Sequence, residues 1–152
     1  MRSATEIPIT ENQARSVASA LALLDEELCL FEEYGNGRER HSVCYGERNR
    51  LTVGQRKALL VEIERLRELM AEIKRDLRLR IDAEDVARRI WGTSAGFWEI
   101  VAEMESKRLK GYGEVAPSLA GYLDPRVERL LKLLQAVSGL IAAGETGNSE
   151  AE

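Results

Sequence analysis

Residues 59–77, LLVEIERLRELMAEIKRDL, decide the fold class of this chain. The apolar side chains in this stretch recur at alternating spacings of three and four residues, which brings them onto one face of an α-helix. That face consists of Leu59, Ile63, Leu66, Met70, Ile73 and Leu77. Because an apolar stripe is unfavourable in water, the pattern indicates a partner helix that covers it.

Three other stretches repeat this spacing. The first carries Ala14, Val17, Leu21, Leu24, Leu28 and Phe31, the third carries Val86, Ile90, Thr93, Phe97, Ile100 and Met104, and the fourth carries Val127, Leu130, Leu134, Val137 and Ile141. Four such helices predict an all-α fold, an antiparallel (up-down-up-down) four-helix bundle with two longer connections. A single bundle domain is expected over residues 10–144, between an N-terminal tail at residues 1–9 and a disordered C-terminal tail at residues 145–152.

Polar residues with capping preferences predict where the helices begin. Thr10 with Gln13 three residues later forms a capping-box pattern, and Thr52 is the expected N-cap of the second helix. Asp124 followed directly by Pro125 predicts the start of the fourth helix, because proline suits the first helical position.

The boundary between the second and third helices has two possible positions. One is a break near Asp82, with Asp82 as the N-cap of the third helix. The other is a helix that continues to Trp91 and turns at residues 92–96. The break at Asp82 is favoured because continuing the second stripe would bury charged side chains. The third helix is then expected to end near Lys110.

The composition is that of a soluble protein, with 44% hydrophobic and 32% charged residues. No apolar run approaches the roughly 20 residues that span a bilayer, and the N-terminus does not resemble a secretory signal. We therefore expect a cytoplasmic protein. In that compartment Cys29 and Cys44 are expected to be reduced, with Cys29 buried as a small apolar side chain.

Few residues suit metal or catalytic chemistry. His41 is the single histidine, lies in a predicted loop and has only Cys44 nearby as a second metal ligand. Metal sites in helical bundles, and zinc sites generally, need more ligands than these. Ser42 beside His41 is not a recognisable catalytic arrangement. The sequence therefore favours no intrinsic metal or cofactor and leans away from an enzyme.

The connection between the first two helices is the leading candidate for a binding site. Arginine donates paired hydrogen bonds to phosphate or carboxylate, so the loop predicts a site for an anionic partner. Its candidate residues are Arg38, Arg40, His41, Arg48 and Arg50. The alternative is a solvated connection that folds back onto the acidic first helix. Nucleic acid is an unlikely partner, because the chain has no extended basic tail.

Trp91 and Trp98 are a second candidate, because seven residues bring them to the same face of the third helix. Core packing explains them most simply. If the chain's own helices leave this face uncovered, the two indoles become a protein interface, since exposed tryptophans often anchor such interfaces.

These observations favour a small interaction or scaffold module that contacts a protein partner, most simply itself as a homo-oligomer. The hypothesis depends on apolar residues beside each stripe that widen it beyond a two-helix contact, namely Leu60, Leu69, Trp98, Leu131 and Leu140. Two alternatives stay open. One is a ligand-binding or catalytic bundle with its site between helices or under the loop at residues 35–51, and the other is nucleic-acid binding through the loop arginines.

Overall fold

The computed structural model describes residues 6–147, with side chains described up to residue 142. Its elements are α1 (Glu11–Gly35), α2 (Val53–Asp76), α3 (Val86–Ala102), α4 (Ser106–Leu109), the 3-10 turn η1 (Lys110–Tyr112) and α5 (Pro117–Gly147). Within the described range there is no strand, only an isolated antiparallel bridge between His41 and Gly46. The predicted all-α class is confirmed.

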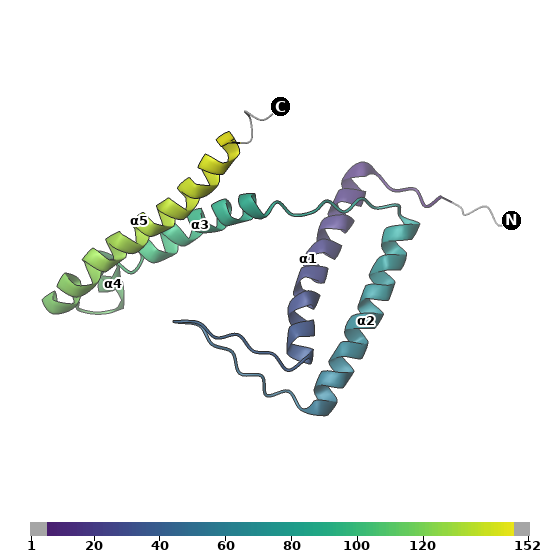
Figure 1. The fold of residues 1–152 in the computed structure, drawn as a ribbon, viewed down its shortest axis with the longest axis horizontal. Helices are drawn as coiled ribbons and strands as arrows, with labels where there is room; N and C mark the ends of the chain where they lie inside the picture. Colours follow the sequence, from purple (N-terminus) through teal and green to yellow (C-terminus); the bar gives the residue numbers. More distant parts are fainter. Residues whose placement is uncertain (1–5, 148–152) are drawn as a thin grey trace. The chain divides into compact units, whose positions relative to one another are not determined.

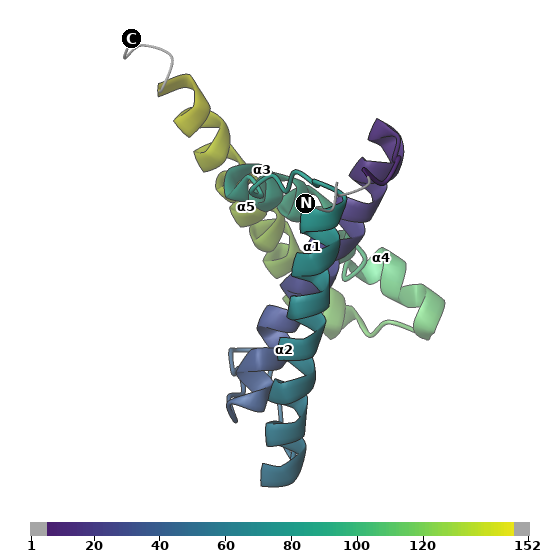
Figure 2. The ribbon, with the colours of Figure 1, turned by 90° about the vertical axis from the view of Figure 1, so that its right-hand side faces the viewer.

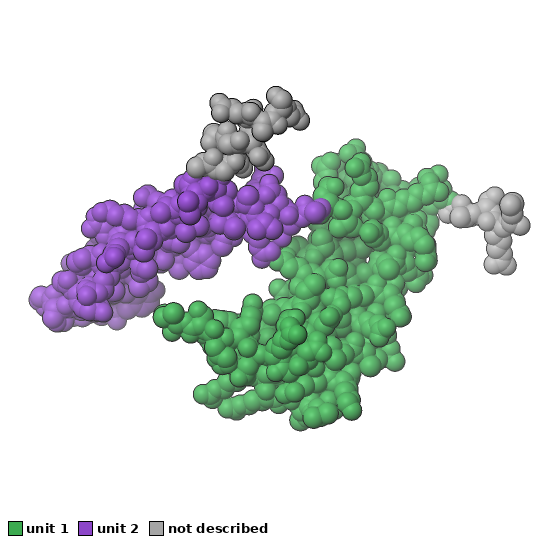
Figure 3. Space-filling model, viewed as in Figure 1, with its two compact units in different colours: residues 1–82 green, residues 83–152 purple. Residues whose placement is uncertain are grey.

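The chain divides into two compact units, Met1–Asp82 and Ala83–Glu152, which Figure 3 colours separately. In the first unit α1 packs against α2, and in the second α3 and α4 pack against α5. Figures 1 and 2 show that the long helices of each unit lie side by side, and the colours of Figure 1 show that they run in opposite directions. Each unit is thus a helical hairpin. A bundle of all four long helices, and the single domain over residues 10–144, stay predictions.

Both predicted N-caps of the first unit are confirmed. The Thr10 hydroxyl accepts a hydrogen bond from the Gln13 backbone N–H at 3.1 Å, and the Gln13 side chain accepts one from the Thr10 backbone N–H at 3.0 Å. Thr52 and Gln55 form the same reciprocal pair at the start of α2. Such boxes satisfy two backbone donors that have no partner within the helix.

The helices of the first unit approach closely at the end of α1. Leu28 and Ile63 are buried in the contact. Gly35 is buried too, and a Cβ atom built there would lie 2.7 Å from Cδ2 of Leu60. Leu60, which the sequence offered as a residue for a wider interface, therefore packs within its own hairpin.

The break between the second and third helices lies where it was predicted. α2 ends at Asp76, and α3 begins at Val86 and continues past residues 92–96. The predicted cap is wrong, since Asp85 and not Asp82 accepts the hydrogen bond from the Arg88 backbone N–H, at 3.3 Å. Asp85 directly precedes the first helical residue, which is the position from which a side chain reaches the third helical N–H.

The end of the third helix and the start of the last one differ from the prediction. α3 stops at Ala102, well before residue 110, and α5 begins at Pro117 and runs through Pro125. Asp124 is not an N-cap. Its carboxylate instead accepts hydrogen bonds from the backbone N–H and the hydroxyl of Ser106, at 2.8 and 2.7 Å, which hold the start of α4 against α5 and lower the pKa of Asp124.

The predicted C-terminal tail is partly helical, because α5 continues to Gly147 and does not stop at residue 144. Residues 148–152 of that tail lie outside the described residues, as do residues 1–5 of the predicted N-terminal tail.

Candidate interaction surfaces

In the second unit the predicted inward stripe is exposed on α3 and only partly covered on α5. On α5 the covered positions are Ala120, Leu123, Asp124, Val127, Leu131, Leu134, Ser138 and Ile141, with Val127 fully buried. On α3 the most covered positions are Ala87, Ser94 and Val101. Of the predicted stripes, Leu130 and Val137 on α5 and most of the α3 residues stay exposed. The predicted inward face is therefore wrong for α3, whereas on α5 it is correct at Val127, Leu134 and Ile141 and wrong at Leu130 and Val137.

The exposed stripes of α3 and α5 are large and apolar. We call them together the apolar face, which consists of Val86, Phe97 and Ile100 on α3, Met104 in the turn that follows it, and Leu119, Leu130, Leu133, Val137 and Leu140 on α5. These side chains are between 38% and 73% exposed. Leu140 is also one of the residues that the sequence offered for a wider interface.

The two stripes of the apolar face point to the same side of the hairpin. On both helices the exposed positions other than Phe97 come one residue before a covered position, and one residue corresponds to a rotation of about 100°. Since the helices run in opposite directions, an equal rotation away from their contact turns both stripes to the same side. The hairpin therefore offers one continuous apolar surface.

The first unit repeats this layout. Leu24 and Phe31 on α1, with Leu66 and Leu69 on α2, are 40–54% exposed. The same helical geometry places these residues on one side of the α1–α2 contact.

Ion pairs close the opposite side of the α1–α2 contact. The Arg67 guanidinium donates to the carboxylate of Asp25 at 3.2 Å and to that of Glu32. Cys29 lies at this same edge, 3.6 Å from the Arg67 guanidinium, and is exposed, so its predicted burial is wrong. A thiol one position past Leu28 is turned toward this polar edge.

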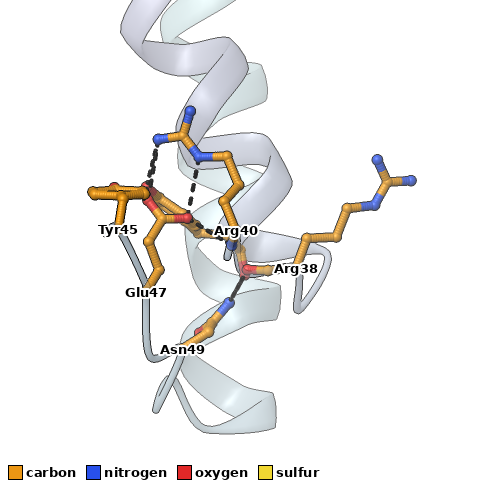
Figure 4. A network of polar contacts seen from close by, with 6 residues as sticks. Arg38, Arg40, Tyr45, Glu47 and Asn49 are labelled. Carbon is orange, nitrogen blue, oxygen red and sulfur yellow. Dashed lines mark hydrogen bonds and ion pairs between the residues drawn. The ribbon is translucent and has the colours of Figure 1, made fainter. Parts of the chain in front are cut away.

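The loop between α1 and α2 is organised around the Glu47 carboxylate. Figure 4 shows the Arg40 guanidinium over that carboxylate, with Nε 3.2 Å and Nη2 3.1 Å from its oxygens. The hydroxyls of Tyr34 and Tyr45 also donate to it. The Arg40 hydrogen bonds, and then those from the two tyrosines, hold the pKa of Glu47 well below its usual value. The side chain of Glu47 is only 12% exposed, because the side chains that donate to it surround it in the centre of the loop.

Asn49 fastens the returning half of the loop to the outgoing half. Its side-chain amide donates to the backbone carbonyls of Tyr34 at 2.8 Å and Arg38 at 3.0 Å, and Figure 4 shows the second of these contacts. Its backbone N–H donates to the Glu39 carboxylate at 2.8 Å. The loop therefore has a defined conformation.

Three of the five residues proposed for anion binding already contact carboxylates. Arg38 pairs with Glu33 at 2.6 Å and Arg40 with Glu47. His41 lies 3.0 Å from Glu39.

Arg48 and Arg50 are exposed, and in the described part of the chain no ion pair is recorded for either. The five residues thus do not form one free cationic cluster. The sequence missed Glu47, Tyr34 and Asn49 as the residues that organise the loop. The feature of the sequence that could have identified Glu47 is the position of a carboxylate among several arginines.

Trp91 and Trp98 lie at the surface, 54% and 39% exposed. With Ser94, Ala95 and Glu99 of α3 and Leu134, Gln135 and Ser138 of α5 they line a groove of about 360 Å³, which we call the tryptophan groove. Trp91 and Trp98 lie three residues before and four residues after the buried Ser94, and Gln135 lies one residue after Leu134. These steps rotate all three positions away from the contact in the direction opposite to the apolar face. The groove therefore opens on the side of the hairpin opposite the apolar face.

A larger hollow, of about 510 Å³, lies between α1 and residues 78–82 in the first unit. Two of its arginines are in ion pairs, Arg15 with Glu11 at 3.3 Å and Arg78 with Glu6 at 3.2 Å. Among the described residues no group of three or more His, Cys, Asp and Glu side chains is placed to hold a metal ion. No described helix has the length and apolarity to cross a membrane.

Comparison with known proteins adds no relative to this description. No protein-family description, curated protein or solved structure matches the chain. The function must therefore be argued from the surfaces described above.

Proposed function

We propose that this protein is a helical interaction module that associates with a second copy of itself through the apolar face. The observation that carries the proposal is the nine large apolar side chains of that face, collected on one side of the α3–α5 hairpin. Contiguous apolar surface of this kind is rare on monomeric soluble proteins and marks interaction sites.

The amount of exposed surface supports the same conclusion. The chain exposes 12787 Å². A compact chain of this mass would expose about 7700 Å², and two separate compact domains of half the mass about 9300 Å² together. A standard protein–protein interface buries only about 1600 Å² in total. The excess is large enough to supply such an interface.

The spacing within the apolar face fits another helical hairpin as its partner. Leu130, Leu133, Val137 and Leu140 follow one another at steps of three and four residues, which is the spacing of helices that interlock side chains along their length. A two-fold pair of identical hairpins would bring four helices together around one core. The predicted four-helix bundle would then form between two chains.

A ligand-binding or catalytic site has less support. Such a site needs several polar groups that converge in an apolar pocket. The described hollows are open to solvent, and the arginines of the largest one are mostly held by carboxylates of their own hairpin.

Replacement of Leu133 by glutamate tests the proposal. Leu133 is 57% exposed, so Leu133→Glu leaves the hairpin contact intact but places a charge in the proposed interface, where burial without a partner is costly. We expect the variant to elute as a monomer by size-exclusion chromatography with light scattering, at unchanged helical circular dichroism.

Leu23→Glu is the matched control, since Leu23 is 66% exposed on α1, is not a residue of the apolar face and lies outside the α1–α2 contact. It is expected to keep the mass of the wild type. Equal masses for the wild type and both variants would contradict self-association through the apolar face.

A further inference from the structure

The tryptophan groove combines two kinds of group that attract a cation. The indoles of Trp91 and Trp98 present aromatic faces, whose negative quadrupole attracts an ammonium or guanidinium group. Glu99 lies beside them and is exposed. Gln135 and Ser138 of α5 supply hydrogen-bonding groups along the opposite wall.

Glu99 differs from the acidic residues that follow it in the chain. Glu103 pairs with Arg108 at 3.9 Å and Glu105 with Lys107 at 2.9 Å. For Glu99 no ion pair is recorded within the described part of the chain, although it lines the same groove as the two exposed tryptophans. Its charge is available to a partner from outside the hairpin.

We propose that the tryptophan groove binds a lysine or arginine side chain of a protein partner. The cation would lie against the indole faces and pair with the Glu99 carboxylate. Neither attraction is strong alone at an exposed site, but both favour the same cation.

This inference does not depend on self-association. The groove and the apolar face lie on opposite sides of the hairpin, so a dimer formed through the apolar face leaves the groove open. Such a dimer would present two grooves, and a partner with two basic segments would gain from binding both.

The tryptophans themselves provide the measurement, because Trp91 and Trp98 are the only two in the chain. The full-length protein is titrated with hexa-arginine, and in parallel with hexacitrulline, which has the same shape without the charge. The indole N–H signals are followed by NMR. We expect both indole signals to shift saturably with hexa-arginine and to stay in place with hexacitrulline.

Two variants with the same change in net charge separate the groove from general attraction. Glu99→Gln is expected to weaken hexa-arginine binding by about threefold or more. Glu128→Gln is the control, since Glu128 does not line the groove and is already paired with Lys132 on α5, and is expected to bind as the wild type does. Indole signals that do not shift, or equal weakening in the two variants, would overturn the proposal. Neither result bears on the mass of the protein, which tests the apolar face separately.

Discussion

Glu47 shows how one carboxylate can give a charged loop a fixed conformation. It accepts hydrogen bonds from the Arg40 guanidinium and from the hydroxyls of Tyr34 and Tyr45, side chains that come from the end of α1 and from both halves of the loop. The contact also raises the pKa of Tyr34, because its hydroxyl donates to the carboxylate. Arg40, which the sequence offered as a binding residue for an anionic partner, therefore stabilises the conformation of its own loop.

The lowered pKa of Glu47 makes the loop sensitive to acid. A carboxyl group whose pKa is lower in the folded than in the unfolded state adds stability above its unfolded pKa, and that stability is lost as the pH falls toward the folded value. We expect the backbone amides of the loop to lose hydrogen-exchange protection in Glu47→Gln at pH 7. The difference in loop protection between the wild type and Glu47→Gln should shrink as the pH falls below about 4, because Glu47 of the wild type then begins to take up a proton. Glu33→Gln, which removes the exposed Arg38 pair, should change protection little.

Gly35 tests the close approach of the two helices in the first unit. A methyl group in Gly35→Ala would meet the Leu60 side chain at 2.7 Å, and overpacking of this kind costs about 1–3 kcal/mol. The higher helix propensity of alanine relative to glycine stabilises the folded protein by about 1 kcal/mol or less at a helix end. We expect a lower midpoint of urea unfolding, restored in part by adding Leu60→Ala.

Gly54→Ala is the control for this substitution, because the nearest atom to a Cβ there is 3.9 Å away. It should leave the midpoint unchanged or raise it. A Gly35→Ala variant as stable as the wild type would show that the helices are further apart than described.

At the scale of whole elements, the sequence predicted the helices better than their ends. The N-caps Thr10 and Thr52 belong to local patterns, and both were identified, although the box that Thr52 forms with Gln55 was not predicted. Asp124 with Pro125 is an equally good local pattern for a helix start, yet α5 runs through it. The Asp124 carboxylate accepts a hydrogen bond from the Ser106 hydroxyl instead of capping the helix. These two residues are far apart in the sequence, so a local pattern does not reveal their contact.

Pro125 offers a test of the continuous α5. Inside a helix proline removes one backbone hydrogen bond and crowds the preceding turn, at a cost of up to about 3 kcal/mol. Pro125→Ala should therefore raise the melting temperature of the protein. Pro117→Ala, at the first residue of α5, should have little effect, because no intrahelical partner is lost there. A lower melting temperature for Pro125→Ala would indicate that the helix begins at Pro125.

The inward stripe was misassigned in α3, and in α5 at Leu130 and Val137, for a related reason. Both helices carry two apolar stripes one residue apart, for example Leu130 and Leu131, or Leu133 and Leu134 on α5. Spacing alone does not decide which stripe faces the hairpin partner and which faces outward. The extra stripe was nevertheless visible in the sequence as apolar residues beyond those that a two-helix contact needs, and it led to the interaction hypothesis.

At the scale of the whole molecule, the sequence predicted an all-helical chain with few groups suited to catalysis. The candidate surfaces were predicted only in part. Trp91 and Trp98 were singled out, but the groove depends on residues of α5 that no pattern connects to them. The apolar face depends on which stripe each helix turns outward, and packing decides that.

We propose that a second copy of the chain covers the apolar face. Sedimentation equilibrium of the wild-type protein tests it most directly, over concentrations from about 1 to 100 µM, because interfaces of standard size have affinities in the micromolar range or tighter. The account predicts a molar mass twice the 17.0 kDa of one chain at the upper end of this range, with any decrease appearing on dilution. A mass of 17.0 kDa at every concentration would contradict it.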